Sequence, residues 1–182
     1  TYYKVPKMHF NKKAAYAFAA RFYLYYTKWA KAEEMATEVL GDTPTNLRNW
    51  IAFQALGNND PHAKEYTREG VEANLMLASV SSYARRFIDG QTVGRFAHSR
   101  GTAVRETFRD ANNLWTNNYK DKQYESFRVD ASKYIYTKYP TYTGNNTQIV
   151  LFTTDETLLV RAEARILQKN YTGAVADLNL FA

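Results

Sequence analysis

The sequence contains no cysteine among its 182 residues. That absence excludes disulfide bonds, a thiolate nucleophile and every zinc site built on cysteine. It does not fix the compartment, because many bacterial envelope proteins also lack disulfides. A chain of this length corresponds to one domain, or to one domain with an appendage, and it can bury about two thirds of its unfolded surface without such cross-links.

No apolar run approaches the roughly 18 residues that a membrane-spanning helix needs. The longest candidate, AAYAFAA at 14–20, is ended by Arg21. The first residues, TYYKVPK, lack the apolar stretch of a signal peptide. The last residues, DLNLFA, read as the interior of a helix. We therefore expect a soluble piece of a longer protein.

Catalytic and metal-binding motifs are missing as well. The sequence has no nucleophile elbow, no zinc-protease helix, no glycine-rich phosphate loop and no calcium loop. His9, His62 and His98 have no neighbours at the spacing of metal ligands. Carboxylates such as Asp89 and Asp110 cannot be shown to converge, as the two of a glycosidase must. We predict that the chain is not an enzyme and holds no metal or cofactor.

Charge of one sign is only mildly in excess, at a net +6. Lysines and arginines are interleaved with acids, as in KWAKAEE and RETFRD, which is typical of solvated surfaces. The densest basic run, Lys4, Lys7, Lys12 and Lys13, is too sparse for a nucleic-acid tail. We expect no nucleic-acid partner, whose mark would be a steep salt dependence of binding.

Two helices are predicted near the start of the chain, at 11–27 and 29–40. Asn11 caps the first and Gly41 ends the second. The short link between them requires an antiparallel hairpin. A shorter helix at 45–56 follows, and the first helix carries apolar residues on most sides. The apolar faces expected to be buried are Ala15, Phe18, Ala19, Phe22 and Tyr25 or Tyr26, then Ala32, Met35, Ala36 and Val39, then Leu47, Trp50, Ile51 and Leu56.

Residues 63–143 are less regular. NLMLASV at 74–80 fits a strand or a buried helix, SKYIYTKY at 132–139 alternates like a strand, and GNNTQ at 144–148 predicts a turn. Beyond them, Thr153 and Glu156 form a capping-box pattern before a helix at 155–168. Thr172 caps a last helix. The apolar sides of these helices are Leu158, Leu159, Ala162, Ile166 and Leu167, then Ala174, Val175, Leu178 and Phe181.

The fold class predicted from these patterns is mainly α, with helical hairpins and an irregular, partly β insert. We assign residues 1–56 to an N-terminal hairpin region. Residues 57–150 form the insert and the candidate ligand-binding region. Residues 151–182 form a second, truncated hairpin.

An internal repeat links the two hairpins at one constant offset. When the chain is slid over itself so that Ala20 falls on Ala162, Ala32 falls on Ala174. The same shift, which we call the repeat offset, places the aromatic Trp29 on Tyr171 and Leu24 on Ile166. Small residues let paired helices approach closely, and the aromatic residue is expected to plug the open end of each hairpin. This is the logic of tetratricopeptide repeats, although any tight helical hairpin favours alanine.

Two stretches resemble the SusD/RagB family of outer-membrane nutrient-binding lipoproteins. FTTDETLLVRAEARILQKNYTGAVADLN at 152–179 resembles its hallmark pair of helices, and KKAAYAFAARFYLYYTKWAKAEEMATEVLG at 12–41 resembles an earlier tetratricopeptide hairpin of that family. LRNW at 47–50, EANLML at 72–77 and, more weakly, GRFAH at 94–98 are similar to shorter pieces in the family's order. The chain departs from the family in size and in lacking the cysteine that carries the lipid anchor.

The resemblance implies a function at the cell surface of a bacterium. The longer protein to which this chain would belong is expected to be anchored by lipid in the outer membrane, beside a SusC-like TonB-dependent transporter. It would capture oligosaccharide, or in some members peptide, for import without cleaving it. The alternative is a helical scaffold that binds the transporter or a peptide and no glycan.

The insert supplies the residue types that bind sugars. An aromatic ring stacks on the apolar face of a pyranose, and amides or arginine bond its hydroxyls. Trp115 also continues a helical face through Val104, Phe108 and Ala111 and can equally be core. The candidate ligand-binding residues are Tyr83, Arg95, Asn112, Trp115, Tyr119 and Tyr124, with Arg86, His98 and Asn113 nearby in the sequence.

Overall fold

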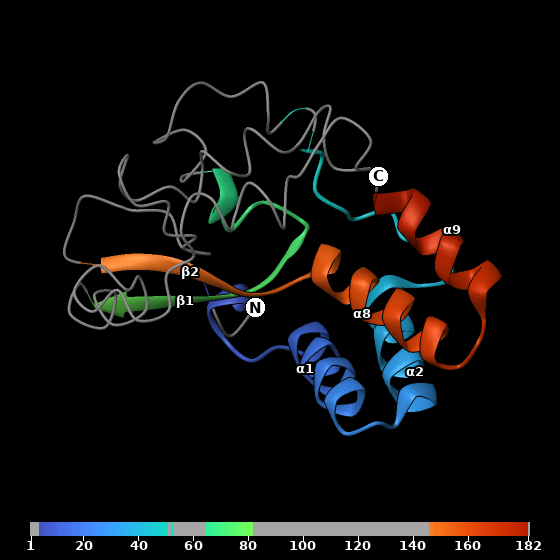
Figure 1. Cartoon of the computed structure of the whole chain (residues 1–182). Helices are drawn as coiled ribbons and strands as arrows, with labels where there is room; N and C mark the ends of the chain where they lie inside the picture. Colours follow the sequence, from blue (N-terminus) through green and yellow to red (C-terminus); the bar gives the residue numbers. More distant parts are fainter. Residues whose placement is uncertain (1–3, 51, 53–64, 82–145, 182) are drawn as a thin grey trace, which may run out of the picture. The chain divides into compact units, whose positions relative to one another are not determined.

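The computed structural model describes residues 4–50, 52, 65–81 and 146–181. This part is mainly helical, with four α-helices and a small two-stranded antiparallel sheet (Figure 1). The mainly α class with some β structure is therefore confirmed at that level. None of the described helices is long and apolar enough to cross a membrane. The elements are η1 (Pro6–Met8), α1 (Lys12–Tyr25), α2 (Trp29–Leu40), β1 (Asn74–Ser81), β2 (Asn146–Thr153), α8 (Thr154–Leu167) and α9 (Tyr171–Phe181).

The chain divides into two compact units. The first consists of Thr1–Arg48, Glu69–Ala78 and Val150–Ala182, and the second of Asn49–Arg68 and Ser79–Ile149. All four described helices belong to the first unit. In the second, the guanidinium of Arg68 forms an exposed ion pair with Glu65 at 2.7 Å. The helical scaffold is thus a unit in itself.

Side-chain caps begin the first helix of each hairpin. The Oδ1 of Asn11 accepts a hydrogen bond from the backbone N–H of Ala14 at 3.0 Å. The Oγ1 of Thr153 accepts one from the backbone N–H of Glu156, also at 3.0 Å. Each bond satisfies an amide that has no partner within its helix. The caps predicted at Asn11 and Thr153 are therefore confirmed.

The cap predicted at Thr172 is wrong. Helix α9 begins at Tyr171, so Thr172 lies inside it. The Oδ1 of Asn170 accepts the capping hydrogen bond from the backbone N–H of Gly173 at 3.1 Å.

The turn between α1 and α2 is a Schellman motif. The backbone N–H of Lys28 donates to the carbonyl of Tyr23 at 2.9 Å, and that of Thr27 to the carbonyl of Leu24 at 3.1 Å. Thr27 adopts a left-handed backbone with φ of 59°. This conformation ends α1 and reverses the chain before Trp29, which confirms the predicted tight hairpin.

The turn between α8 and α9 repeats that geometry. The backbone N–H of Asn170 donates to the carbonyl of Arg165 at 2.8 Å, and that of Lys169 to the carbonyl of Ile166 at 2.9 Å. Lys169 is left-handed, with φ of 64°. The repeat offset found in the sequence therefore also relates the two hairpins in structure. It separates three pairs of helix boundaries, which are Lys12 and Thr154, Tyr25 and Leu167, and Trp29 and Tyr171.

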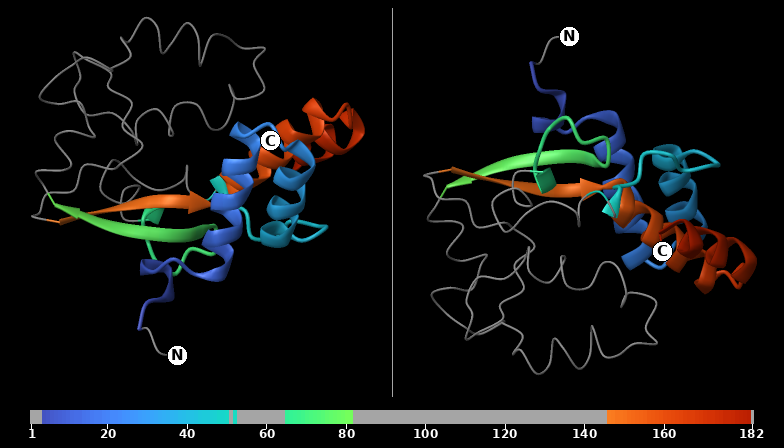
Figure 2. Two further views of the ribbon diagram at one scale, coloured as in Figure 1. Left: turned by 90° about the horizontal axis from the view of Figure 1, so that it is seen from below. Right: turned by 90° about the horizontal axis from the view of Figure 1, so that it is seen from above.

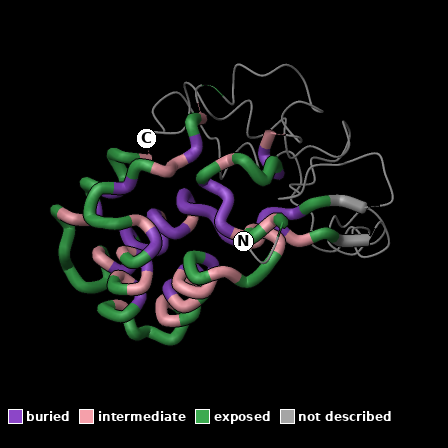
Figure 3. Tube along the Cα trace, turned by 180° about the vertical axis from the view of Figure 1, so that it is seen from behind, coloured by how far each residue is buried: buried purple, intermediate pink, exposed green. Residues whose placement is uncertain are grey.

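The two hairpins lie side by side although a long stretch of chain separates them. α8 contacts both α1 and α2 on one side and α9 on the other (Figures 1 and 2). Buried positions recur along the helices between exposed ones (Figure 3), and alanines occupy many of them. The fully or nearly fully buried alanines are Ala14, Ala17 and Ala20 of α1, Ala32 and Ala36 of α2, Ala162 and Ala164 of α8, and Ala174 of α9.

The alanine half of the repeat prediction is confirmed, and the aromatic half is wrong at one end. Ala20, Ala162, Ala32 and Ala174 are buried. Trp29 is half-buried. Tyr171, at the equivalent place, is 60% exposed and plugs nothing. The Schellman bonds already close the turn, so a bulky side chain is not needed there.

The expected inward face of α1 is wrong. The buried residues of α1 are its alanines, whereas Phe18, Phe22, Tyr25 and Tyr26 are exposed. Ala15 and Ala19 are half-buried. Because apolar residues occupy most of this helix, periodicity alone cannot decide which side faces inward. The small side faces inward because it allows close approach to α2.

The other apolar faces are confirmed in part. In α2, Ala32, Ala36 and Val39 are buried as predicted, and Met35 is half-buried. In α8 and α9 the buried members of the predicted faces are Leu158, Ala162 and Ala174, while Leu159 and Phe181 are half-buried. The exposed members are Ile166, Leu167, Val175 and Leu178. The outer side of α9 is thus apolar and exposed.

The sheet corrects one prediction and decides another. Residues 74–80, which fitted either a strand or a helix, belong to strand β1. The turn predicted at 144–148 is wrong from Asn146 onward, because β2 begins there. Pairing with a distant strand overrides local turn preference. In the first unit, Leu75 of β1 and Phe152 of β2 join a core cluster with Ala14, Ala17 and Val39.

The helix predicted to begin at residue 45 does not begin there. Residues 44–49 are not helical. The carbonyl of Asn46 accepts from the Thr154 hydroxyl at 2.6 Å, and the backbone N–H of Arg48 donates to Asp155 at 3.0 Å. These bonds hold the segment along the start of α8. Leu47 and Trp50 are both half-buried, and Ile51 and Leu56 lie outside the described residues.

Candidate functional site

The predicted ligand-binding residues all lie outside the described part of the chain. The same holds for the strand predicted at 132–139. These assignments therefore stay predictions. The residues concerned are Tyr83, Arg95, Asn112, Trp115, Tyr119 and Tyr124.

The described scaffold carries a surface that sequence reasoning missed, a row of aromatic rings along α1. Phe18 and Phe22 stack with centroids 6.3 Å apart, and Phe22 and Tyr26 with centroids 5.6 Å apart. Phe10 extends the row, 6.1 Å from Phe18. All four are at least 49% exposed. We call Phe10, Phe18, Phe22 and Tyr26 the aromatic row.

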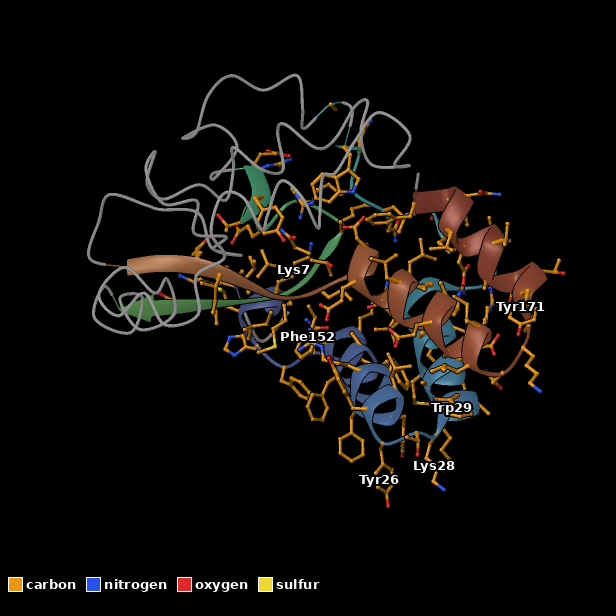
Figure 4. The ribbon with its side chains drawn as sticks, in the orientation of Figure 1. Lys7, Tyr26, Lys28, Trp29, Phe152 and Tyr171 are labelled. Atoms are coloured by element: carbon orange, nitrogen blue, oxygen red, sulfur yellow. The ribbon has the colours of Figure 1, made fainter. Side chains whose placement is uncertain are left out.

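A cation anchors the inner edge of this row. The guanidinium of Arg21 lies 4.4 Å from the ring centre of the buried Phe152. Its Nη2 also donates to Glu156 at 2.7 Å and to the carbonyl of Leu151 at 2.9 Å. The rings of Phe152 and Phe18 are in edge contact, with their centroids 6.4 Å apart. Phe152 is labelled beside α1 in Figure 4. Arg21 thereby fastens α1 to the junction of β2 and α8.

Two lysines approach rings at the hairpin tip. The Nζ of Lys28 lies 6.0 Å from the ring centre of Tyr26, and that of Lys31 lies 5.5 Å from that of Tyr23. Exposed cation–π pairs of this kind contribute about 0.5–1 kcal/mol. Tyr26, Lys28 and Trp29 lie together at the tip of the first hairpin (Figure 4). The aromatic row therefore ends in a cationic rim.

A buried ion pair joins α8 to α9. The guanidinium of Arg161 holds the carboxylate of Asp177 through two bonds, of 3.0 Å from Nε and 2.7 Å from Nη2. The two side chains are only 1% and 2% exposed. Nη1 of Arg161 donates to the carbonyl of Gly41, just beyond α2, at 2.9 Å. The arginine thus satisfies groups from both hairpins.

A second arginine extends this polar layer to α2. Arg165 donates to Asp177 at 2.8 Å and to Glu33 of α2 at 2.8 Å. Gln168 donates to the other oxygen of Glu33, also at 2.8 Å. All these charges are paired within the scaffold, so the layer is a structural seam between hairpins. It is the physical role of the arginines in the RAEAR stretch.

Another polar cluster surrounds the start of α8. The Oδ1 of Asp155 accepts from the backbone N–H of Arg48, whose Nη2 donates to Asn74 at 2.7 Å. Thr154 bonds the backbone of residues 46 and 73. Burial raises the pKa of Asp155, and the N–H and charge of Arg48 oppose that rise. Asp155 is oriented by the scaffold and is only 6% exposed.

Neither cluster offers a metal centre. Among the residues that the structure describes, no group of three or more His, Asp or Glu side chains could hold a metal ion. The carboxylates of Glu33 and Asp177 are each held by arginine or amide donors. The scaffold therefore supports helix packing and presents an aromatic surface.

Comparison with known proteins gives no match: no protein-family model, curated protein or solved structure matches the chain. A function for this chain therefore rests on its own residues and on the resemblance that they carry.

Proposed function

We propose that this chain is part of a non-catalytic, glycan-capturing protein of the SusD/RagB type, which serves a TonB-dependent transporter at the bacterial outer membrane. One observation supports the proposal above all. The two stretches that resemble the family, 12–41 and 152–179, fold as two helical hairpins that pack on each other. Segments that resemble one family would be expected to form one scaffold.

The geometry of the hairpins supports a tetratricopeptide-like assignment. Each hairpin has buried alanines on its helices and the same Schellman turn, and the helix starts of the two hairpins are related by the repeat offset. The polar seam of Arg161, Asp177, Arg165 and Glu33 ties one hairpin to the next. Such a scaffold can hold an inserted binding region in a fixed place.

The binding region in this proposal is the insert. Tyr119 and Tyr124 would stack on sugar rings, and Arg95 and Asn112 would bond hydroxyl groups. Tyr83 and Trp115 would complete the platform. Capture, rather than cleavage, follows from the absence of a recognisable catalytic pair in the sequence.

The proposal is tested by affinity electrophoresis of the full chain through gels that contain one polysaccharide class each. Retention by one class, lost in Tyr119→Ala or Tyr124→Ala, is expected. The control is Tyr25→Ala, which removes a ring that is 84% exposed on α1 and should leave retention unchanged. Equal retention of all variants would refute the assigned residues, and no retention by any polysaccharide would count against glycan capture.

The exposed apolar surfaces favour a second candidate, a protein-binding scaffold. The rings of the aromatic row on α1 are exposed and contact one another. Single exposed apolar side chains are ordinary on protein surfaces, whereas a contiguous group indicates a binding surface. In this reading the chain binds its transporter or a peptide without any glycan. A pull-down with the transporter separates the two, because only the scaffold reading predicts protein binding by a chain that no polysaccharide retains.

A further inference from the structure

The seam between α2 and α8 defines how one hairpin receives the next. On the α2 side, Ala36 shares a core cluster with Val160 of α8. Glu33 of α2 accepts hydrogen bonds from Arg165 of α8 and from Gln168, the residue that follows α8. The seam therefore has two halves. We call Glu33 and Ala36, on the second helix of the first hairpin, the receiving stripe. We call Val160, Ala164 and Gln168, on and just after the first helix of the following hairpin, the inserting stripe.

At the repeat offset, the residues of the inserting stripe correspond to residues of the aromatic row. Val160 of α8 corresponds to Phe18 of α1, and Gln168, which follows α8, corresponds to Tyr26, which follows α1. Ala164, between them, corresponds to Phe22. Phe18, Tyr26 and Phe22 are exposed by 49%, 59% and 50% respectively. The aromatic row is thus an inserting stripe that stays exposed in the described scaffold.

The same offset carries the receiving stripe onto the outer side of α9. Glu33 and Ala36 of α2 correspond to Val175 and Leu178 of α9. These side chains are 53% and 37% exposed, beside Tyr171 at 60%. α1 and α9 lie on opposite sides of α8 in Figure 1. The two-hairpin unit therefore exposes both halves of its own seam, one at each end.

We propose that a second copy of the chain fills this seam, with α9 of one protomer against α1 of its partner. The contact continues the α2–α8 interface that the chain already uses internally. It is heterologous, joining two different surfaces, so it leaves one receiving and one inserting stripe free and permits further addition. This association does not depend on the proposed glycan capture.

The chemistry of both stripes fits a contact driven by apolar burial. The only charged side chain of α9, Asp177, is buried in its pair with Arg161. Val175 replaces the acid Glu33, Leu178 replaces the smaller Ala36, and Phe22 replaces the smaller Ala164. Larger side chains on both sides set the helices further apart within the usual interaxial range of about 8–10 Å. Association should therefore persist at high salt, because screening weakens only charge contacts.

Sedimentation velocity of the full chain over a concentration series tests the proposal. The wild-type sedimentation coefficient is expected to rise with concentration, and Phe22→Glu and Val175→Glu are each expected to abolish the rise. A one-to-one mixture of the two variants should form a dimer and nothing larger, because each variant retains the half that the other lacks. Circular dichroism should show both variants folded, since both positions are exposed.

A wild-type chain that stays monomeric at every concentration would overturn the proposal. So would a mixture of the two variants that fails to dimerise, or self-association that survives either substitution.

Cysteine cross-linking tests the register, and the chain has no cysteine to interfere. The Gln168–Glu33 bond maps onto Tyr26 of one copy and Val175 of the next. A Tyr26→Cys, Val175→Cys chain should form a disulfide-linked ladder on oxidation. The control pair, Glu34→Cys with Val175→Cys, places the first thiol on an exposed position of α2 and should give none. Equal ladders from both pairs would overturn the proposed register.

Discussion

At the scale of single residues, the two hairpin turns contain avoidable backbone strain. Thr27 and Lys169 have positive φ without being glycine. The left-handed conformation costs an ordinary residue about 1–2 kcal/mol, and glycine avoids this cost. Part of the gain is offset because glycine makes the unfolded chain more flexible. We expect Thr27→Gly to raise the free energy of unfolding by about 0.5–1 kcal/mol, measured by urea denaturation.

The matched control for that prediction is Lys28→Gly. Lys28 follows Thr27 but has an ordinary φ of −97°. Glycine there removes no strain and should not stabilise the chain. A Thr27→Gly chain no more stable than the wild type would show that the turn is already relaxed.

The buried alanines make a second prediction at this scale. Ala162 is 2% exposed in the contact region of α8. Ala162→Leu should overpack that region and lower the free energy of unfolding by about 1–3 kcal/mol. Its neighbour Glu163 is exposed, so Glu163→Leu is the control and should change stability little. Equal effects of the two substitutions would contradict the assigned packing.

Asp155 gives a pH dependence with a definite sign. Burial raises its pKa in the folded state above the ordinary value of 3.8. The folded chain therefore takes up this proton more readily than the unfolded chain does. Its stabilising contribution is complete below pH 3.8 and is lost as the pH rises through the folded-state pKa.

Asp155→Asn should remove this component of the pH dependence. As the pH rises above 3.8, the free energy of unfolding of the wild type should fall relative to that of the variant. Denaturation at a series of pH values measures the difference. Asp42→Asn changes an exposed acid and serves as control. A constant difference between wild type and Asp155→Asn would contradict the raised pKa.

At the scale of elements, the pair of Arg161 and Asp177 should dominate the docking of α9. Removing one member of a buried ion pair costs about 3–5 kcal/mol, because the other charge stays buried. Arg165 remains beside Asp177, so Arg161→Met should lie near the lower limit. The double variant Arg161→Met, Asp177→Leu should lose less than the sum of the two single losses. Additive losses in denaturation would show that the two side chains are not coupled.

How much of each element the sequence predicts depends on whether local signals suffice. Caps and turns are local, so the starts at Asn11 and Thr153 could be predicted. The inward side of α1 could not, because alanines and aromatics both read as apolar and only the partner helix selects between them. The start of β2 was missed because its pairing strand lies far away in the sequence. The helix predicted from residue 45 does not form there, because the backbone of this segment is hydrogen-bonded to Thr154 and Asp155 instead.

At the scale of the whole molecule, an internal repeat is joined across a long insert. The entropy cost of closing a loop grows only slowly with its length, so the insert between the hairpins is tolerated. The repeat offset could be read from alanines, and the structure extends it to helix ends, turns and backbone angles. The candidate glycan residues remain a prediction, because aromatic composition alone does not fix their positions.

The proposed function is capture of a glycan without cleavage. The most direct measurement is mass spectrometry of an oligosaccharide series that has been incubated with the chain and co-eluted with it on size exclusion. We predict that one class of oligosaccharide co-elutes and that its chain length is unchanged. Shortened products would show an enzyme, and the absence of any co-eluting glycan would contradict capture.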